Sequence, residues 1–357
     1  MNSLSEQSHV RIVRSESLGR IILDRPKALN SLTHAMVREI EAALDRFELD
    51  PTIAAVMISG SGERGFCAGG DIRMIYESGK GKDGLAIAFW RDEYRLNARI
   101  SRLRKPYVAI MDGITMGGGV GISAHGRHRV ATDRLRFAMP ETGIGFFPDV
   151  GATWLLSRAP GETGTYLGLT GAIIGASDAI YVGLADRLVP SDRLSALCDG
   201  LSSLGANSDS KKIDRAIAAL AVDPPRAPLM EQRDVIDRTF SFDTVEQICT
   251  ALQSAGGEFA RQTLETLGSK SPTALKVTLR MLREARGSNS LEVCLNREFA
   301  ACAAVLAGPD FYEGVRAAVI DKDRNPRWSP ASIDDVTNDI VENYFLPGAD
   351  LPFMGAR

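Results

Sequence analysis

The sequence predicts an α/β fold whose strands form a mostly parallel or spiral sheet, followed by a mostly helical C-terminal part. Two observations lead to this prediction. To about residue 190, short apolar runs alternate with glycine-rich loops and with segments of helical periodicity. Beyond that point the chain is mostly helical, and GANSDSKK and DPPRAP are its clearest loops. We therefore expect a core over residues 10–190 and a helical region over 191–357 that packs on it.

The elements follow from local patterns in chain order. Two short strands flank SESLG, a turn signal for a hairpin. A helix with apolar residues at helical spacing follows, and Pro51 ends it. Buried-type strands and amphipathic helices then alternate. The expected strands are 10–14, 20–24, 53–59, 107–112, 129–132 and 135–138, and the expected helices are 30–50, 72–78, 85–103, 149–157, 162–169 and 176–182.

Composition excludes some classes of function. Charged residues nearly cancel, to a formal net charge of -3, so no basic excess points to nucleic acid. No apolar run approaches the roughly 18 residues of a membrane span, and the opening MNSLSEQSHV has no secretory pattern. The five cysteines are odd in number and scattered, which is typical of reduced thiols, and we expect a cytoplasmic protein. The two histidines of HGRH have no third ligand nearby, so we expect no metal.

Two glycine-rich loops each follow a strand and precede a helix. They are FCAGGD at 66–71 and TMGGGVG at 115–121. Glycine lets backbone N–H groups approach a ligand, and at a helix start these groups have no intrahelical partners. Two such loops can aim two N–H groups at one oxygen, which is an oxyanion hole. Neither loop fits a phosphate-binding motif. The alternative interpretation is a pair of tight turns.

The stretch MPETGIGFFPDVG places two carboxylates, Glu141 and Asp149, in an otherwise apolar run. They either lie on a turn that faces water or point into a dry pocket. In a pocket, burial raises the pKa of a carboxyl group and suits it to general acid–base work. For Asp149 the alternative is a helix N-cap.

In this order and spacing, FCAGGD, GITMGGGVG and MPETGIGFFPDVG resemble the crotonase superfamily, as do LDRPKALNSL and ASDAIYVGLADRLVP. The resemblance implies a crotonase-like ββα spiral core. It also implies an acyl-CoA substrate whose thioester oxygen is bound by two backbone N–H groups. By position in the loops, these would belong to Ala68 and Gly118.

The reaction is read from the carboxylates. A hydratase of this superfamily uses two glutamates, and the resemblance places them at Glu141 and at residue 121, which here is Gly121. Asp149, DEYRLN at 92–97 and DFYEGVRAAVIDKDRNPRWSP at 310–330 instead resemble the 3-hydroxyisobutyryl-CoA hydrolase subgroup. This subgroup implies Glu141 as base or nucleophile, assisted by Asp149.

The same subgroup implies that Glu93 contacts the acyl part, whose hydroxyl needs an acceptor. The alternative for Glu93 is a solvated helix face with Asn97 as its partner. Nearby polar residues have plainer interpretations. Asp71 is expected to cap a helix, Arg25 and Lys27 are weak candidates for the coenzyme's phosphates, and Cys67 is an improbable nucleophile.

Together with these residues, the resemblance implies a thioesterase for short-chain 3-hydroxyacyl-CoA. The best match is conversion of 3-hydroxyisobutyryl-CoA to 3-hydroxyisobutyrate and coenzyme A in valine catabolism, and a 3-hydroxypropionyl group, which differs by one methyl, stays open. The expected substrate-binding residues are Glu93, Gly118, Glu141 and Asp149. No cofactor is expected, because coenzyme A is part of the substrate. The superfamily resemblance implies a trimer-based homo-oligomer. Two rivals stay open: a hydratase or isomerase of the same fold, and a non-catalytic acyl-CoA-binding protein.

Overall fold

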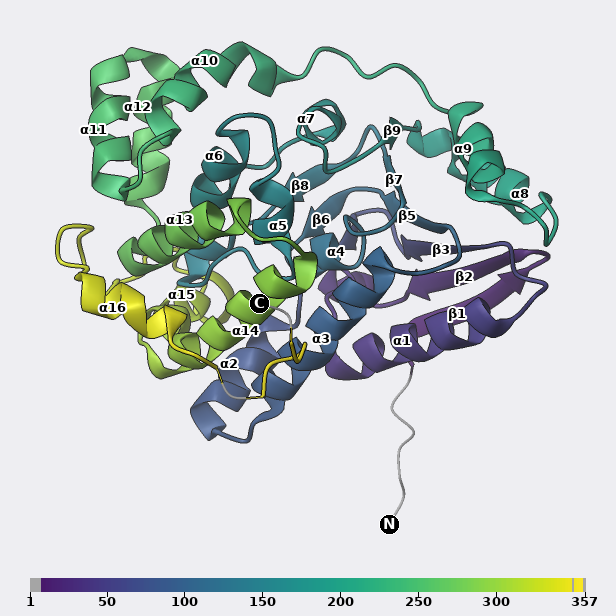
Figure 1. Cartoon of the computed structure of the whole chain (residues 1–357), viewed down its shortest axis with the longest axis horizontal. Coiled ribbons are helices and arrows are strands. Elements are labelled where there is room, and N and C mark those ends of the chain that lie inside the picture. Colours follow the sequence, from purple (N-terminus) through teal and green to yellow (C-terminus); the bar gives the residue numbers. More distant parts are fainter. Residues whose placement is uncertain (1–7, 349, 356–357) are drawn as a thin grey trace.

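The computed structural model describes residues 8–348 and 350–355, and its centre is a pair of sheets (Figure 1). The larger sheet has six strands in the order β1-β2-β3-β5-β7-β9, and the smaller has three in the order β4-β6-β8. The strands are β1 Val10–Ser15, β2 Leu18–Leu23, β3 Ala55–Gly60, β4 Gly65–Cys67, β5 Tyr107–Met111, β6 Ile114–Met116, β7 His128–Ala131, β8 Arg136–Ala138 and β9 Arg187–Leu188.

The strands wind between the two sheets as a spiral. β1 and β2 form the predicted antiparallel hairpin, and every other pairing is parallel. β3, β5 and β7 lie in the large sheet, and the strand that follows each of them, β4, β6 or β8, lies in the small sheet. The predicted α/β class with a parallel-dominated sheet is therefore confirmed. β4 and β6 differ from the prediction, because both lie within or beside stretches expected to be glycine-rich loops.

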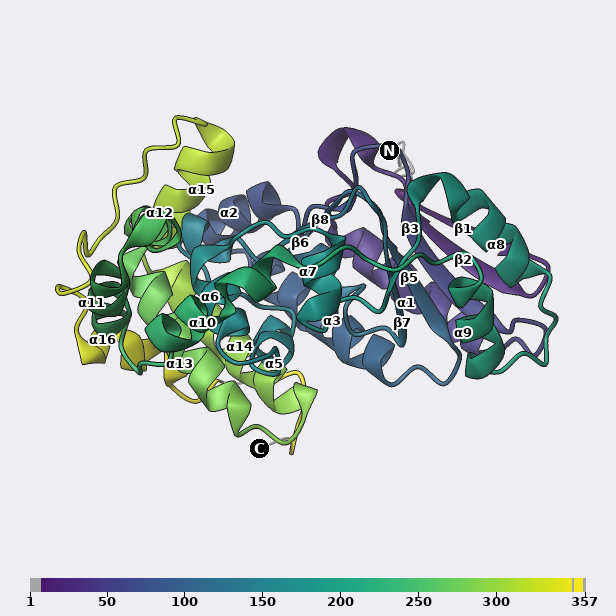
Figure 2. The same cartoon turned by 90° about the horizontal axis from the view of Figure 1, so that it is seen from above.

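Helices cover both faces of the large sheet (Figure 2). α8 and α9 pack on one face through apolar residues that meet β2, β3, β5 and β7. α1 and α3 bury their apolar side chains against the other face. The helices up to this point are α1 His34–Leu49, α2 Ile72–Gly81, α3 Leu85–Ser101, α4 Gly118–Gly121, α5 Ala152–Leu156, α6 Thr163–Thr170, α7 Ala176–Tyr181, α8 Leu194–Ser202 and α9 Ser210–Ala218.

The remaining helices gather beside the small sheet (Figure 1). They are α10 Pro228–Phe240, α11 Val245–Ala255, α12 Gly257–Gly268, α13 Pro272–Arg286, α14 Leu291–Ala307, α15 Asp310–Val315 and α16 Asn338–Glu342. One cluster of buried apolar side chains runs from Val10 to Val341, and α14 lies against α3 and α5. The division into residues 10–190 and 191–357 stays a prediction. None of the helices in the described residues is both long and apolar enough to span a bilayer.

Candidate active site

Three adjacent parallel strands end beside the candidate site. β4 leads into Ala68–Gly70, β6 leads into Gly117 and Gly118, and β8 leads within three residues to Glu141. The carboxyl ends of neighbouring parallel strands lie at the same edge of a sheet, and ligands of α/β proteins bind at this edge. The small sheet thus brings both glycine loops and the first catalytic candidate to one place.

All five predicted site residues line one cavity of about 320 Å³. Ala68, Gly118 and Glu141 come from the ends of the small sheet, Glu93 comes from α3, and Asp149 comes from the loop before α5. The other lining residues are Gly69, Gly70, Ile72, Ile75, Phe89, Trp90, Met116, Gly117, Pro140, Gly143, Ile144, Phe146 and Lys270. An apolar wall with a few converging polar groups is typical of a small-molecule site.

The second glycine loop leaves no space for side chains. A Cβ atom at Gly118 would clash with Glu93 Oε1 and would lie 3.2 Å from the Gly70 nitrogen. A Cβ atom at Gly117 would lie 3.0 Å from Glu141 Oε1, and this residue has a φ of 49°. These glycines let the backbone meet the carboxylates directly, which a plain tight turn would not require.

The structure changes one of the two predicted N–H donors. The N–H of Ala68 already donates to Leu29 O at 3.0 Å, so it is not free for a ligand. Leu32 forms a parallel bridge with Gly70. Its N–H donates to Gly69 O, and its carbonyl accepts from Asp71 N. In such a parallel bridge the N–H of Gly70 points away from Leu32. Since that nitrogen lies beside Gly118, Gly70 replaces Ala68 as the candidate donor.

Glu141 begins a single turn of 3-10 helix, Glu141–Ile144, and is only 6% exposed. Its Oε2 has no hydrogen-bond partner in the part of the chain that the structure describes. Burial, and then the charge of Asp149, raise the pKa of Glu141 well above its ordinary value. An unpartnered buried carboxyl group at the end of a strand is a candidate base or nucleophile.

Asp149 is 5% exposed and accepts a hydrogen bond from the Tyr94 hydroxyl at 2.8 Å. Burial raises the pKa of Asp149 to about 7, against the Tyr94 hydrogen bond, which lowers it. The following helix begins at Ala152 with Gly151 as its N-cap, later than the predicted start at residue 149. The Asp149 side chain therefore does not cap the helix, and its carboxylate faces the cavity.

Glu93 lies on the buried side of α3 and is only 2% exposed. Its Oε1 has no partner among the described residues, and burial, then Asp149 and Glu141, raise its pKa well above the ordinary value. The alternative of a solvated pair with Asn97 is wrong, because Asn97 is fully buried and forms no hydrogen bond with Glu93.

Three buried carboxyl groups in one cavity cannot all be ionised near neutral pH, because each charge opposes the others. Burial raises the pKa of Glu93, Glu141 and Asp149, and the charge of Asp149 raises the pKa of both glutamates further. Neighbouring carboxyl groups with perturbed pKa values are typical of sites of acid–base catalysis.

Residue 121 has no room for a carboxylate. A Cβ atom at Gly121 would lie 2.7 Å from both Asn97 Nδ2 and Val150 Cβ. The second glutamate that a hydratase needs at this position is thus excluded by packing as well as by sequence. Glu93 approaches the same loop from α3 instead.

Other predicted residues have structural partners. Asp71 is the N-cap of α2, as predicted, and accepts from Met74 N at 3.3 Å. Arg25 forms an ion pair with Asp71 at 2.9 Å, so its guanidinium is already engaged. Burial raises the pKa of Cys67 to about 12, which removes the thiolate that a nucleophile needs. The HGRH histidines are also engaged, His125 with Val150 O and His128 with Asp214.

Sequence reasoning missed two polar residues of the site, of which Lys270 lines the cavity and Tyr94 binds Asp149. Tyr94 orients Asp149, and Lys270 lines the cavity close to Gly143. The Lys270 ammonium has no acceptor among the described residues, and burial lowers its pKa. The tyrosine follows the predicted Glu93 directly within DEYRLN, but residues i and i+1 of a helix do not share a face, so spacing did not mark it. Lys270 lies in an ordinary loop sequence far along the chain, where no local pattern marks it.

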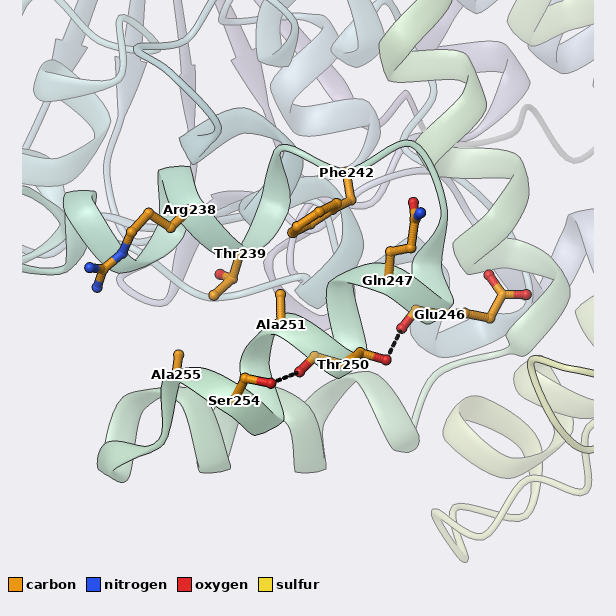
Figure 3. A pocket seen from close by; sticks show the side chains of 9 residues that line it. All are labelled: Arg238, Thr239, Phe242, Glu246, Gln247, Thr250, Ala251, Ser254 and Ala255. Atoms are coloured by element: carbon orange, nitrogen blue, oxygen red, sulfur yellow. Dashed lines mark hydrogen bonds between the residues drawn. The ribbon is translucent and has the colours of Figure 1, made fainter.

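A larger hollow of about 770 Å³ lies between α10 and α11, away from the glycine loops (Figure 3). Its hydroxyls bond along the helix, because Thr250 donates to Glu246 O and Ser254 donates to Thr250 O. Its carboxylate, Glu246, forms an ion pair with Lys276. The smaller cavity is the better candidate, because it alone of the two unites unpartnered carboxyl groups with glycine-loop N–H groups.

Comparison with known proteins points to one family. Residues 18–345 match the model of the enoyl-CoA hydratase/isomerase family. The relatives named "3-hydroxyisobutyryl-CoA hydrolase, mitochondrial" include that of Xenopus laevis, which is 44% identical, and that of Homo sapiens, which is 43% identical. Each alignment covers 94% of this chain and 88% of the relative.

Two crystal structures are similar over nearly the whole chain. A carnitinyl-CoA dehydratase from Mycobacterium thermoresistibile has a TM-score of 0.92 and 44% identity, with 98% of this chain and 100% of that chain covered. An enoyl-CoA hydratase from Rhodobacter sphaeroides 2.4.1 has a TM-score of 0.88 and 41% identity, with 95% and 98% covered. These neighbours confirm the predicted crotonase-like fold.

The comparison overturns the predicted cytoplasmic location. The curated relatives reported above are named as mitochondrial proteins, which contradicts a cytoplasmic location. The prediction depended on unpaired cysteines and on a short opening segment. Unpaired thiols exclude an oxidising compartment but do not select among the reducing ones. Residues 1–7 of that segment lie outside the described residues.

Proposed function

The chain belongs to the enoyl-CoA hydratase/isomerase family, and we propose that within it this protein hydrolyses 3-hydroxyisobutyryl-CoA to 3-hydroxyisobutyrate and coenzyme A. One observation carries the proposal: three buried carboxyl groups converge on the glycine loops, while residue 121 is closed to the hydratase glutamate. The names of the relatives at 43–44% identity support it. Such a reaction would belong to valine breakdown.

In the proposed mechanism the thioester oxygen accepts hydrogen bonds from the backbone N–H groups of Gly70 and Gly118. Each oxyanion donor contributes about 2.7–4 kcal/mol to the transition state. Glu141 either takes a proton from a water that attacks the carbonyl carbon, or attacks that carbon itself. Either attack gives a tetrahedral intermediate, whose collapse breaks the C–S bond, and the coenzyme A thiolate leaves with a proton from the carboxyl cluster or from water. Attack by water gives the free acid directly, whereas attack by Glu141 leaves a mixed anhydride that water then hydrolyses to the free acid and the Glu141 carboxylate.

Asp149 and Glu93 take supporting parts in this proposal. The Tyr94 hydrogen bond fixes the Asp149 carboxyl group, which then positions water or supplies the proton for the thiolate. Glu93 Oε1 has no partner in the described chain, so a hydroxyl at carbon 3 of the acyl group would satisfy it. A short acyl group fits a cavity of about 320 Å³ lined by Trp90 and Phe146.

The test is thiol release from 3-hydroxyisobutyryl-CoA, with hydration of crotonyl-CoA followed in parallel. We expect Glu141→Gln and Asp149→Asn to lose at least about 100-fold in kcat, since general acid–base groups contribute that much or more. Glu162→Gln is the matched control, because Glu162 is buried and ion-paired with Arg283 and Arg286 outside the cavity. It should stay active.

A hydratase or isomerase is the second candidate, because the two structural neighbours carry dehydratase and hydratase names. Hydration of crotonyl-CoA without thiol release would replace the hydrolase proposal with this one. Label from heavy-oxygen water appearing in Glu141 after a single turnover would identify it as the nucleophile. Label only in the product would show that water attacks the acyl carbon, as base catalysis by Glu141 requires.

A further inference from the structure

The turn after Asp149 holds a backbone conformation that its own residues do not favour. Val150 has a φ of 53° and Gly151 has a φ of 78°. Glycine adopts this left-handed region readily, but a β-branched residue there is strained. Such a conformation persists only where surrounding contacts impose it, and it costs of order 1–3 kcal/mol. Something other than the local sequence must hold this turn.

Two buried side chains from distant elements bind the turn. The Val150 carbonyl lies 2.8 Å from His125 Nε2, which must carry the hydrogen because a carbonyl only accepts. The Gly151 N–H donates to Glu298 Oε2 at 2.7 Å. Glu298 Oε1 accepts from Thr153 N at 3.2 Å and from the Thr153 hydroxyl at 2.5 Å. The Val150 carbonyl and the Gly151 N–H belong to one peptide unit, which His125 and Glu298 therefore bind from opposite sides.

Glu298 belongs to the C-terminal helix α14, 147 residues after Gly151. It is fully buried, and the hydrogen bonds that its carboxylate accepts within the described residues come from the turn and from the start of α5. One helical turn later on α14, Cys302 Sγ lies 3.7 Å from the Tyr94 hydroxyl that binds Asp149. α14 thus approaches Asp149 both through the backbone turn and through Tyr94, the hydrogen-bond partner of Asp149.

We infer that Glu298 and His125 are positioning residues that hold the strained Val150–Gly151 turn and thereby fix the Asp149 carboxylate in the cavity. The inference builds on the proposed hydrolase and adds a role for the C-terminal helices. Neither side chain lines the cavity, so neither touches the substrate directly. Their effect on catalysis passes through Asp149, since a catalytic group displaced by about 1 Å can lose about 100-fold in rate.

The experiment compares Glu298→Leu with Glu298→Gln, alone and in the Asp149→Asn background. Leucine fills similar space without an acceptor, while glutamine keeps an acceptor for the Gly151 N–H. We expect Glu298→Leu to lower kcat at least about tenfold with KM changed less than about twofold, and glutamine to restore most of kcat. In the Asp149→Asn background, adding Glu298→Leu should lower kcat by less than about a further twofold.

The double-variant cycle separates positioning from general destabilisation. A loss that is the same in both backgrounds, or an unchanged kcat in Glu298→Leu, would overturn the inference. Glu162→Gln serves again as the buried-carboxylate control. If Glu298→Leu does not fold, His125→Phe against His125→Gln repeats the comparison on the other side of the turn, because only glutamine keeps a donor for Val150 O.

A second measurement separates failure of the inference from failure of the proposed function. If the wild type releases no thiol, the hydrolase proposal fails, and amide hydrogen exchange then decides the inference. We expect the amides of residues 149–153 to exchange at least about tenfold faster in Glu298→Leu or His125→Phe than in the wild type, while β5 amides stay protected. Equal exchange in that segment would overturn the inference whatever the substrate.

Discussion

The glycine loops and the Asp149 turn both bring backbone and carboxylates together, but they do so in different ways. Gly69, at a φ of 110°, and Gly117, at 49°, adopt conformations that only glycine accepts easily, and the sequence itself encodes them. The Asp149 turn instead has a valine at 53°, held by side chains from α14 and from the segment after α4. One half of the site is therefore local in origin, and the other half depends on tertiary contacts.

The largest expected effect lies in the local half. A methyl group at Gly118 would push away Glu93 Oε1 and would lie 3.2 Å from the Gly70 nitrogen. We expect Gly118→Ala to lower kcat by about 100- to 1,000-fold, the loss that follows removal of an oxyanion donor. Steady-state thiol release measures it. Gly81→Ala is the control, since a Cβ atom at Gly81 meets no other atom within 4 Å. A fully active Gly118→Ala would mean that this loop does not bind the thioester.

In the half of the site that depends on tertiary contacts, we expect a substitution of Asp149 to raise stability while it lowers activity. The pKa of Asp149 is raised by burial to about 7, so the folded protein binds its proton more tightly than the unfolded chain does. Stability from this group is therefore complete below about pH 4 and is lost as the pH rises to about 7. We expect Asp149→Asn to raise Tm by a few degrees at pH 8, with a smaller gain at pH 5. Thermal unfolding at the two pH values measures it, and an equal gain at both would contradict the assignment.

The smallest expected effect concerns Lys270, the residue that the C-terminal part contributes to the cavity lining. Its ammonium has no acceptor in the described chain and lines the cavity near Gly143. We expect Lys270→Met to raise KM for the acyl-CoA about three- to tenfold with kcat unchanged, because losing a single contact to an anionic substrate removes about 1 kcal/mol. Lys276→Met, which removes a lysine paired with Glu246, is the control.

A truncated substrate sharpens this result. The N-acetylcysteamine thioester of the same acyl group lacks the phosphates of coenzyme A. Equal KM values for wild type and Lys270→Met on this thioester would locate the contact at the phosphates. A KM ratio as large as with the full substrate would locate it nearer the acyl end. No change with either substrate would mean that Lys270 does not bind the substrate.

The same contrast explains what the sequence predicts well. The loops FCAGGD and GGGVG, and Glu141 after a strand, depend on local chemistry, and the cavity brings together the five residues that were predicted. β4 and β6 were missed because each has only three residues beside glycine-rich turns. Ala68 was predicted by its position in the loop, and position does not reveal that Leu29 already accepts the Ala68 N–H.

Tertiary contacts account for the rest. Tyr94, Lys270 and Glu298 become visible only when α3 and the C-terminal helices pack around the cavity. No periodicity in their own segments marks them as functional. The helix predicted to start at Asp149 begins three residues later, because a turn imposed by Glu298 and His125 comes first.

The crowded surroundings of Gly121 bear on how enzymes of this fold can change their reaction. A glutamate at this position would collide with Asn97 and Val150, so a single codon change there would yield a misfitted protein rather than a hydratase. An evolutionary route between the two chemistries must first clear space on α3 and in the Asp149 turn. Because Val150 belongs to that turn, clearing space would also disturb Asp149, so the packing around Gly121 links any change at this position to the position of the Asp149 carboxylate.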